Sequence, residues 1–290
     1  MSALADGVHK LSEAAYFGHS ALSASGAKRL LEVSPARWRL EQAAPPRHSP
    51  AFDLGRAAHM LVLRDREAFE IVDAEDWRTK AAREARDGAR AEGLVPLLAH
   101  QFDQVAAMAA ALRRHPWAFE AFSRGAPEQT LLWTDAETGV RRRAKLDWLP
   151  DQGRIFADYK TAADISEDAL QKAIFDHDHY MRAAWYLDGI RALKLAETPV
   201  YLFIFQCKEP PFEVRARQLA PVDLEWGRLR NARALRLFAE CRAADVWPRW
   251  DDDEIRRITM PDWAHRRLEA EHAAEAGAFD PFAPIQTAAE

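Results

Sequence analysis

Two kinds of hydrophobic pattern follow each other along the chain, and the first is helical. Up to about residue 125, apolar side chains recur three and four positions apart, which is typical of helices that bury one face. Ser23 and Ser34 stand where helix N-caps are expected, and Pro35 suits the first position of a helix. The pattern predicts a proline-rich loop over 43–50 and helices over 24–32, 35–42, 52–63 and 94–122, the last one interrupted at Pro116.

Beyond residue 125 the pattern is that of strands separated by turns. Turn-forming residues at 135–139 and 150–153 separate three segments of strand character, which predicts three consecutive antiparallel strands. The apolar run VYLFIFQC indicates a later strand that is buried on both faces. The predicted elements are strands over 128–133, 140–149 and 154–162, a helix over 166–195, strands over 199–207 and 212–219, a helix over 222–244 and a short helix ending near residue 274.

This order of elements predicts an α/β (α+β) fold. We expect an N-terminal helical part over residues 1–125 that packs on a core with C-terminal helices over 126–276, the two forming one structural domain. A disordered tail is expected over 277–290.

Composition and charge narrow the class of protein. With 290 residues, 48% of them hydrophobic, and ten tryptophans, the chain is expected to be globular rather than disordered. It has no apolar run of about 20 residues and no signal-peptide pattern at its start, which predicts a cytoplasmic protein without membrane contact. Its two cysteines exclude a disulfide scaffold. The net charge of −5 argues against a protein that coats nucleic acid, but not against a local basic groove.

Two aspartates on either side of the turn at 150–153 are the strongest candidates for chemistry. In a regular hairpin Asp147 and Asp158 face each other directly, with Cβ atoms roughly 4.5–5.5 Å apart. Facing carboxylates repel, and a divalent cation such as Mg²⁺ or Mn²⁺ between them removes the repulsion. Lys160 emerges on the same face as Asp158, and the backbone carbonyl of Tyr159 remains available to the metal.

Such a patch suits the hydrolysis of phosphodiesters, because a metal ion activates water and an ammonium group stabilises the developing charge. Arg141, Arg143 and Lys145 continue the strand face of Asp147 as a basic row that is suited to phosphates. The alternative is a solvent-exposed hairpin in which Lys160 only screens the two acids. Lys160 follows an otherwise apolar strand start, where stray charges are disfavoured, and this favours the functional interpretation.

Further residues are candidates for supporting roles. Gly55 and His59 share a helix face, so His59 is a candidate metal ligand; the alternative is a half-buried histidine with one hydrogen bond. Glu128 is either an auxiliary ligand or a surface residue at a strand start. Arg182 and Tyr186, four apart on the next helix, are candidates to contact the DNA backbone or to buttress the site.

In this order, G-x-x-x-H at 55–59, Glu128, R-x-K-x-D at 143–147 and D-x-K-T at 158–161 resemble the PD-(D/E)XK nuclease superfamily. Within it, the chain is similar to the RecE-type exodeoxyribonuclease VIII branch of phage and prophage recombination nucleases. The similarity extends over residues 16–265, including Ser34-Pro35 and the segment ITMPDW at 258–263. It implies an α-β-β-β-α-β core, in which helices flank a mixed central sheet, and an N-terminal helical extension that carries His59.

The resemblance also implies a site and an activity. His59, Asp147, Asp158 and the Tyr159 carbonyl would bind Mg²⁺ or Mn²⁺, two ions per site, and Lys160 would be catalytic. The implied reaction is ATP-independent digestion of linear duplex DNA from 5′ to 3′, leaving 3′ single strands for recombination. The chain departs from the family at Arg182, where a glutamine is usual. It lacks the cysteines of an iron–sulfur cluster and the GxxxxGK[ST] motif of an ATP motor.

Two alternatives remain open at this point: an endonuclease or flap-type nuclease with the same site, and a non-catalytic DNA-binding subunit with a decayed site. The complete set of Asp147, Asp158 and Lys160 argues against decay. The expected partners are linear double-stranded DNA, a single-strand annealing protein of the RecT type, and further copies of the chain in a homo-oligomeric ring.

Overall fold

The structure, a computed structural model, describes residues 4–43, 57–61, 69–251, 255 and 257–278. The chain divides into two compact units, Met1–Arg249 and Trp250–Glu290. The second unit contains one described helix, α11 (Asp262–Ala278). The loop predicted over 43–50, Gly55 and most of the predicted tail lie outside the described residues.

The first unit holds the described strands and the remaining described helices. The strands are β1 (Gly7–His9), β2 (Leu22–Ser23), β3 (Phe69–Val72), β4 (Val95–Leu98), β5 (Gly125–Thr134), β6 (Arg141–Pro150), β7 (Ile155–Ala162), β8 (Val200–Cys207) and β9 (Val214–Gln218). The helices are α1 (Glu13–Phe17), α2 (Ala24–Glu32), α3 (Pro35–Ala43), α5 (Lys80–Ala91), α6 (Ala99–Arg114), α7 (Pro116–Ala121), α8 (Glu167–Asp176), α9 (His179–Ala192) and α10 (Pro221–Ala244), and residues 57–61 are also helical.

The longer strands form two sheets of mixed direction. One has the strand order β1-β5-β6-β2, with β5 and β6 antiparallel and β2 parallel to β6. The other has the order β7-β8-β9, in which β7 and β8 run parallel and β8 and β9 antiparallel. A short parallel pair, β3 and β4, stands apart. This arrangement confirms the predicted α/β fold class with parallel and antiparallel strands flanked by helices.

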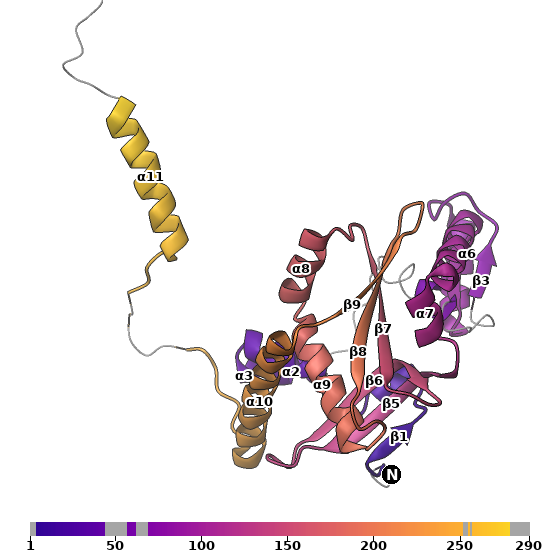
Figure 1. Cartoon of the computed structure of the whole chain (residues 1–290), viewed down its shortest axis with the longest axis horizontal. Coiled ribbons are helices and arrows are strands. Elements are labelled where there is room, and N and C mark those ends of the chain that lie inside the picture. The colour runs from indigo at the N-terminus through magenta and orange to yellow at the C-terminus, as the bar shows by residue number, and fades with distance from the viewer. Residues whose placement is uncertain (1–3, 44–56, 62–68, 252–254, 256, 279–290) are drawn as a thin grey trace, which may run out of the picture. The chain divides into compact units, whose positions relative to one another are not determined.

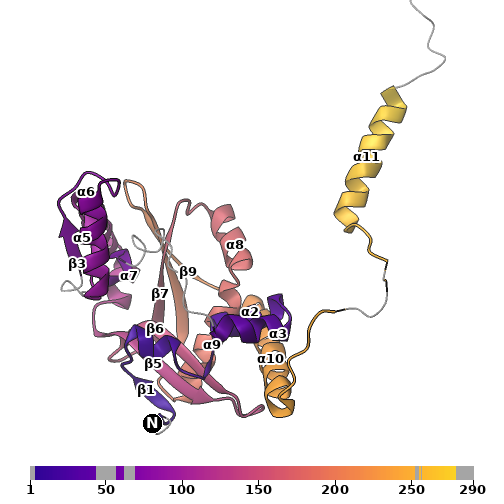
Figure 2. The same cartoon turned by 180° about the vertical axis from the view of Figure 1, so that it is seen from behind.

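Helices cover both faces of the β7-β8-β9 sheet (Figures 1 and 2). Alternate residues of β8 point to opposite sides, as strand geometry requires. Tyr201, Phe203 and Phe205 belong to a core shared with α2, α9 and α10. Leu202 and Ile204 belong to a second core shared with α6, α7 and the helical residues 57–61. The run VYLFIFQC is therefore buried on both faces, as the sequence predicts.

The starts of two helices are explained by capping serines that can be recognised in the sequence. The hydroxyl oxygen of Ser23 accepts a hydrogen bond from the amide of Gly26, 3.1 Å away, and caps α2. Ser34 accepts in the same way from the amide of Arg37 at the start of α3. The two strands predicted over 199–207 and 212–219 are present as β8 and β9, and they pair antiparallel.

Two predicted helices have different limits in the structure. The helix predicted over 94–122 begins only at Ala99, because residues 95–98 form the buried strand β4. Its predicted break at Pro116 is confirmed, since α7 begins there. The helix predicted over 166–195 is divided into α8 and α9 by Asp178, whose left-handed backbone (φ 51°) cannot continue a helix.

The prediction that β6 and β7 form a regular antiparallel hairpin is wrong. β7 pairs with β8, whereas β6 pairs with β5 and β2. The pairing with β8 begins at the turn itself, where the amide of Val200 donates to the carbonyl of Arg154 at 2.7 Å. β6 and β7 still lie side by side, but Asp147 and Asp158 are not partners in a ladder.

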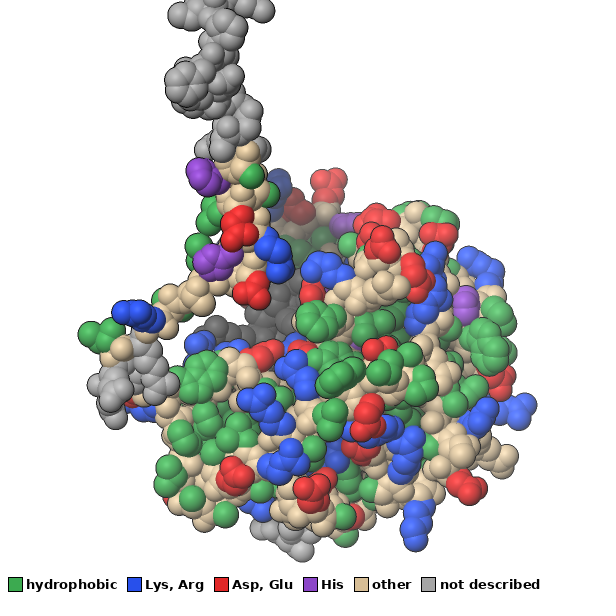
Figure 3. All heavy atoms as spheres, turned by 60° about the vertical axis from the view of Figure 1, so that its left-hand side comes forward, with side chains coloured by type: hydrophobic (Ala, Val, Ile, Leu, Met, Phe, Trp, Pro, Cys, Tyr) green, Lys and Arg blue, Asp and Glu red, His purple; other side chains and the backbone are tan. Residues whose placement is uncertain are grey.

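Charges of both signs are mixed with apolar side chains on the outer face of the first unit that Figure 3 shows. α10 contributes three exposed apolar residues at helical spacing, Val222, Trp226 and Leu229. Among the described helices, none has the length and apolar content needed to cross a membrane.

Close packing of α9 against α10 depends on a glycine. Gly227 is buried in α10, and a Cβ atom at this position would overlap the carbonyl oxygen of Tyr180 and lie 2.9 Å from the Cβ atom of Ala184. Both of these residues belong to α9. The glycine therefore sets the distance between the two helices.

Replacing this glycine should loosen the packing. We expect Gly227→Ala to lower the free energy of unfolding by about 1–3 kcal/mol, because the two helices must move apart. Gly88→Ala in α5 is the matched control, since nothing lies within 4 Å of the added methyl group. It should raise the free energy of unfolding by about 0.5–1 kcal/mol through helix propensity. Urea unfolding measures both changes, and a stabilised Gly227→Ala would contradict the assigned packing.

Candidate active site

Asp158 and Lys160 lie on β7 and face α9. Alternation along the strand buries Phe156 in the core beside α9, and it directs Tyr159 into the opposite core. The Asp158 side chain is only 2% exposed. Its Oδ2 atom forms an ion pair with the ammonium group of Lys160, and its Oδ1 atom lies 3.7 Å from the guanidinium of Arg182.

The buried carboxylate of Asp158 is held by the charges of two neighbouring cations. Both of its oxygens are fully buried, and among the described residues neither has a hydrogen-bond partner of good geometry. An isolated buried carboxylate is strongly unfavourable, so the two cations beside it are what makes this position tolerable. Buried carboxylate oxygens of this kind are suited to a hard divalent cation such as Mg²⁺ or Mn²⁺.

Asp147 approaches the same strand from β6. Its Oδ2 atom accepts the amide hydrogen of Tyr159, 2.7 Å away, where a regular ladder would present a backbone carbonyl. The same oxygen lies 2.9 Å from Nε2 of His59. Burial favours a neutral Asp147, but His59, Lys160 and the Tyr159 amide outweigh it and hold the pKa of this carboxyl well below its usual range.

His59 is carried to Asp147 by the helical residues 57–61. Ala57, Ala58 and Leu61 are buried and fix this turn in the second core. The imidazole lies 5.6 Å from the ring of Tyr159, centre to centre. Burial alone would lower the pKa of His59, but the charge of Asp147 outweighs it and the pKa is raised. The structure therefore brings His59, Asp147 and the β7 backbone together.

A buried hydrogen-bond network fixes Tyr159 from the other side. Its hydroxyl group donates to Oε1 of Gln206 at 2.5 Å, and Nε2 of Gln206 donates to the carbonyls of Met108 at 2.9 Å and Phe212 at 3.1 Å. Gln206 is fully buried, and its bonds to Tyr159 and Met108 are shielded from water. The network holds the backbone of Tyr159, whose carbonyl lies 3.5 Å from the ammonium group of Lys160.

These groups fit a divalent cation. Within the described residues, no three His, Cys, Asp or Glu side chains are gathered as a metal cluster. Mg²⁺ needs fewer, because it commonly takes one or two carboxylates and keeps several waters. Asp147, Asp158 and the Tyr159 carbonyl supply oxygen ligands of this kind. His59 lies where it can bind the metal itself or orient Asp147.

Residues of the predicted basic row of β6 already form ion pairs or hydrogen bonds within the protein. Their partners are Glu128 and the N-terminal segment. Glu128 accepts from Nζ of Lys145 at 2.9 Å and is half exposed. Its backbone is left-handed (φ 52°), and it interrupts the pairing of β5 with β6 at the position opposite Asp147. Arg141 pairs with Asp6, and its Nη1 atom donates to a backbone carbonyl at 2.7 Å.

Arg143 is nearly buried. Its guanidinium donates to the carbonyl of His19 and lies 4.9 Å from the ring centre of Tyr16. Burial lowers the pKa of Arg143, only partly offset by Tyr16. Of the predicted basic row, the structure therefore places Arg143 inside the protein. Binding of DNA by Arg141, Arg143 and Lys145 stays a prediction.

Arg182 and Tyr186 lie on α9, one turn apart. Burial would lower the pKa of Arg182, but Asp158 outweighs it and the pKa is raised. Burial also raises the pKa of Tyr186, so this phenol is neutral. Tyr186 packs edge-on against Tyr201 at 5.6 Å between ring centres. The structure thus brings Arg182 to Asp158, and it places Tyr186 in the core behind it.

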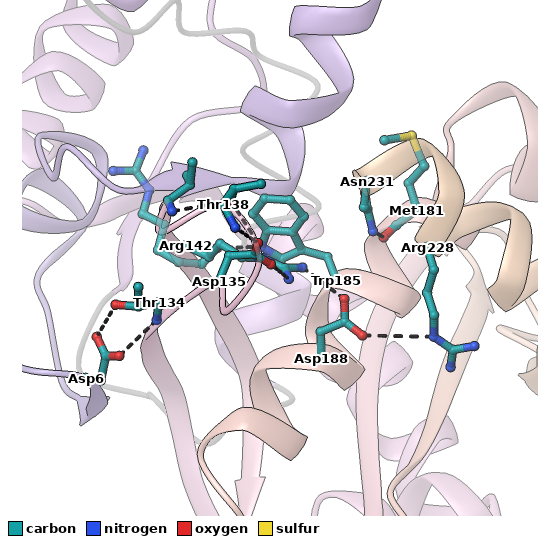
Figure 4. Close-up of polar contacts among 12 residues, drawn as sticks. Asp6, Thr134, Asp135, Thr138, Arg142, Met181, Trp185, Asp188, Arg228 and Asn231 are labelled. Atoms are coloured by element: carbon teal, nitrogen blue, oxygen red, sulfur yellow. Dashed lines mark hydrogen bonds and ion pairs between the residues drawn. The ribbon is translucent and has the colours of Figure 1, made fainter. Parts of the chain in front are cut away.

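Arg142, which no sequence motif singled out, forms two ion pairs at the end of β6 away from Asp147 (Figure 4). Its guanidinium lies 3.2 Å from Asp135 and 3.1 Å from Asp188. It is also 4.8 Å from the ring centre of Trp133 and 4.0 Å from that of Trp185. Charged and aromatic partners together compensate the burial of the arginine. Alternation along β6 could have placed it on the buried face.

Gln206 and His179 are two further buried polar residues that no sequence motif singled out. Gln206 is the one polar residue inside an apolar run, which is a recognisable signal of a buried hydrogen bond. His179 is buried against Phe203, and its Nδ1 atom has no hydrogen-bond partner among the residues that the structure describes. Burial, followed by the charges of Lys160 and Arg182, lowers the pKa of His179 to about 3. Nothing in the local sequence of His179 indicates this position.

Comparison with solved structures supports the same fold. The chain is similar to a crystal structure named "Putative exonuclease" from Eubacterium rectale, with 13% sequence identity and a TM-score of 0.59. The match covers 87% of this chain and 97% of the other. No curated protein matches the chain.

Residues 23–252 match the family described as "PDDEXK-like domain of unknown function (DUF3799)". This span includes Asp147, Asp158 and Lys160, and it contains the structural elements that position them. The match confirms the superfamily that the order of these motifs resembles, without distinguishing its RecE-type branch. The chain therefore belongs to the DUF3799 family of PDDEXK-like domains, within the PD-(D/E)XK nuclease superfamily.

Proposed function

We propose that this protein is a metal-dependent deoxyribonuclease that digests linear double-stranded DNA from its ends. The observation that carries the proposal is the contact of the Asp147 carboxylate with the β7 backbone between Asp158 and Lys160. In a PDDEXK-like chain, these are the residue types that the hydrolysis of a phosphodiester needs. The similarity to a structure named as an exonuclease supports action at DNA ends.

The chemistry divides among a few side chains. A divalent cation, Mg²⁺ or Mn²⁺, would supply an activated water and neutralise phosphate charge. Asp147, Asp158 and the Tyr159 carbonyl would hold it, and His59 would bind it or orient Asp147. The water would lose a proton and form a new bond to phosphorus, while the bond to the leaving sugar oxygen would break and that oxygen would gain a proton. Lys160 is the group to position the water and to stabilise the negative charge on the phosphate.

The finer features of the proposal rest on the sequence resemblance. They are digestion from 5′ to 3′ without ATP, 3′ single strands as the product, and a role in recombination beside a single-strand annealing protein of the RecT type. A homo-oligomeric ring would keep a chain of net charge −5 on its substrate. Among the basic residues predicted to bind DNA, Arg182 is 37% exposed and lies beside Asp158, which supports a contact with a phosphate there.

The direct test compares linear with covalently closed circular duplex DNA. With Mg²⁺, the protein should release acid-soluble nucleotides from the linear form and leave the circle intact, and a chelator should stop the release. Substrates labelled at either the 5′ or the 3′ end give the polarity. Linearised or nicked circles would instead favour the endonuclease alternative. No metal-dependent cleavage of any DNA substrate would refute the proposal.

The first substitution removes the buried carboxylate. Asp158→Asn should reduce nuclease activity by more than about 100-fold, because it removes a direct metal ligand. Loss of a residue that only hydrogen-bonds to a ligand already costs about 10–100-fold. Asp176→Asn on α8 is the control, since this carboxylate is 41% exposed and pairs only with Lys172 among the described contacts. It should keep full activity. Full activity in Asp158→Asn, with the fold verified by circular dichroism, would place the site elsewhere.

The second substitution tests the histidine. His59→Ala should lower activity by about 10–100-fold and weaken Mn²⁺ binding, with partial rescue at high Mn²⁺ concentration. The exposed His177 provides the matched control, and His177→Ala should change neither quantity. Unchanged Mn²⁺ affinity in His59→Ala would show that His59 has no part in metal binding.

A further inference from the structure

Both carboxylates at the site already have cationic neighbours within the described residues before any metal ion binds. Two carboxylates, Asp147 and Asp158, face two cations, Lys160 and Arg182. The two oxygens of Asp158 have one cation each: the Lys160 ammonium at Oδ2, and the Arg182 guanidinium 3.7 Å from Oδ1. The charge of Arg182 is permanent, because a guanidinium does not lose its proton in a protein.

The supply of ligands is limited in the same way. Oδ2 of Asp147 already accepts from Tyr159 and lies 2.9 Å from His59. Among the described residues, no third acidic side chain joins Asp147 and Asp158 in a metal cluster. A first divalent ion would use these two carboxylates. A second ion would need the Oδ1 side of Asp158, where the guanidinium repels it at short range.

We propose that Arg182 takes the place of a second metal ion, so that the site binds one divalent cation. This inference rests on the proposed function. In a site with two ions, the second one stabilises charge on the transferred phosphate. A guanidinium does the same through two parallel hydrogen bonds to phosphate oxygens. Arg182 comes from α9, is 37% exposed, and can therefore reach a substrate while its charge stays beside Asp158.

The test counts Mn²⁺ ions bound to the protein alone, without DNA. Free Mn²⁺ gives an electron paramagnetic resonance signal that is lost on binding, so a titration gives the number bound. Each protein is measured beside the same chain carrying Asp158→Asn, and the difference counts the ions at this site. We expect about one ion in the natural chain and about two in Arg182→Gln, which removes the charge but keeps a polar side chain.

Two variants separate charge from structural damage. Arg182→Lys keeps the charge, and the count should remain about one. Arg230→Gln is the matched control: Arg230 is 40% exposed, lies 3.5 Å from Asp178 and donates to Tyr180. It should leave the count unchanged. Urea unfolding identifies any variant that does not fold.

Each outcome of the count has a clear meaning. One ion in the natural chain that becomes two in folded Arg182→Gln supports the inference. Two ions in the natural chain, or one in folded Arg182→Gln, overturns it and leaves the proposed nuclease function standing. If Arg182→Gln does not fold, a count of two in the natural chain overturns the inference, and a count of one that persists in Arg182→Lys supports it. No ion in the natural chain overturns the inference and the proposed metal dependence together.

Discussion

The burial of one carboxylate constrains the site more than any other interaction. Asp158 is almost inaccessible and finds no hydrogen-bond partner of good geometry in the part of the chain that the structure describes, so it is stable only beside compensating charge. That charge comes from Lys160 on its own strand and from Arg182 on α9. The close packing of α9 on α10 at Gly227, and the network that holds Tyr159, keep these groups in place. The same buried oxygens are the ones that suit a divalent cation.

Local chemistry allowed much of the fold to be predicted from the sequence. Hydroxyl caps at Ser23 and Ser34 fixed the starts of two helices, and the apolar run at β8 identified a strand buried on both faces. The fold class followed from the order of elements. These features depend on a few neighbouring residues, which is why periodicity and capping rules are sufficient for them.

Strand pairing between distant segments was not predictable in the same way. Alternation placed Asp158 and Lys160 on one face of β7, and this is correct. It could not indicate that β7 would pair with β8 from its first residue, so the expected hairpin geometry was wrong. Asp147 reaches the site by accepting the Tyr159 amide through its side chain. Residue types and spacing thus led to the right groups, whereas the burial of Arg143 and the position of Arg182 beside Asp158 required the tertiary structure.

The central claim is that Asp147 and Asp158 together form a metal site for DNA hydrolysis. A crystal structure of the protein with Mn²⁺, using the anomalous signal of the metal, measures this most directly. The claim predicts a peak within roughly 2.0–2.6 Å of carboxylate oxygens from both aspartates. Manganese bound elsewhere, or in contact with neither aspartate, would contradict it.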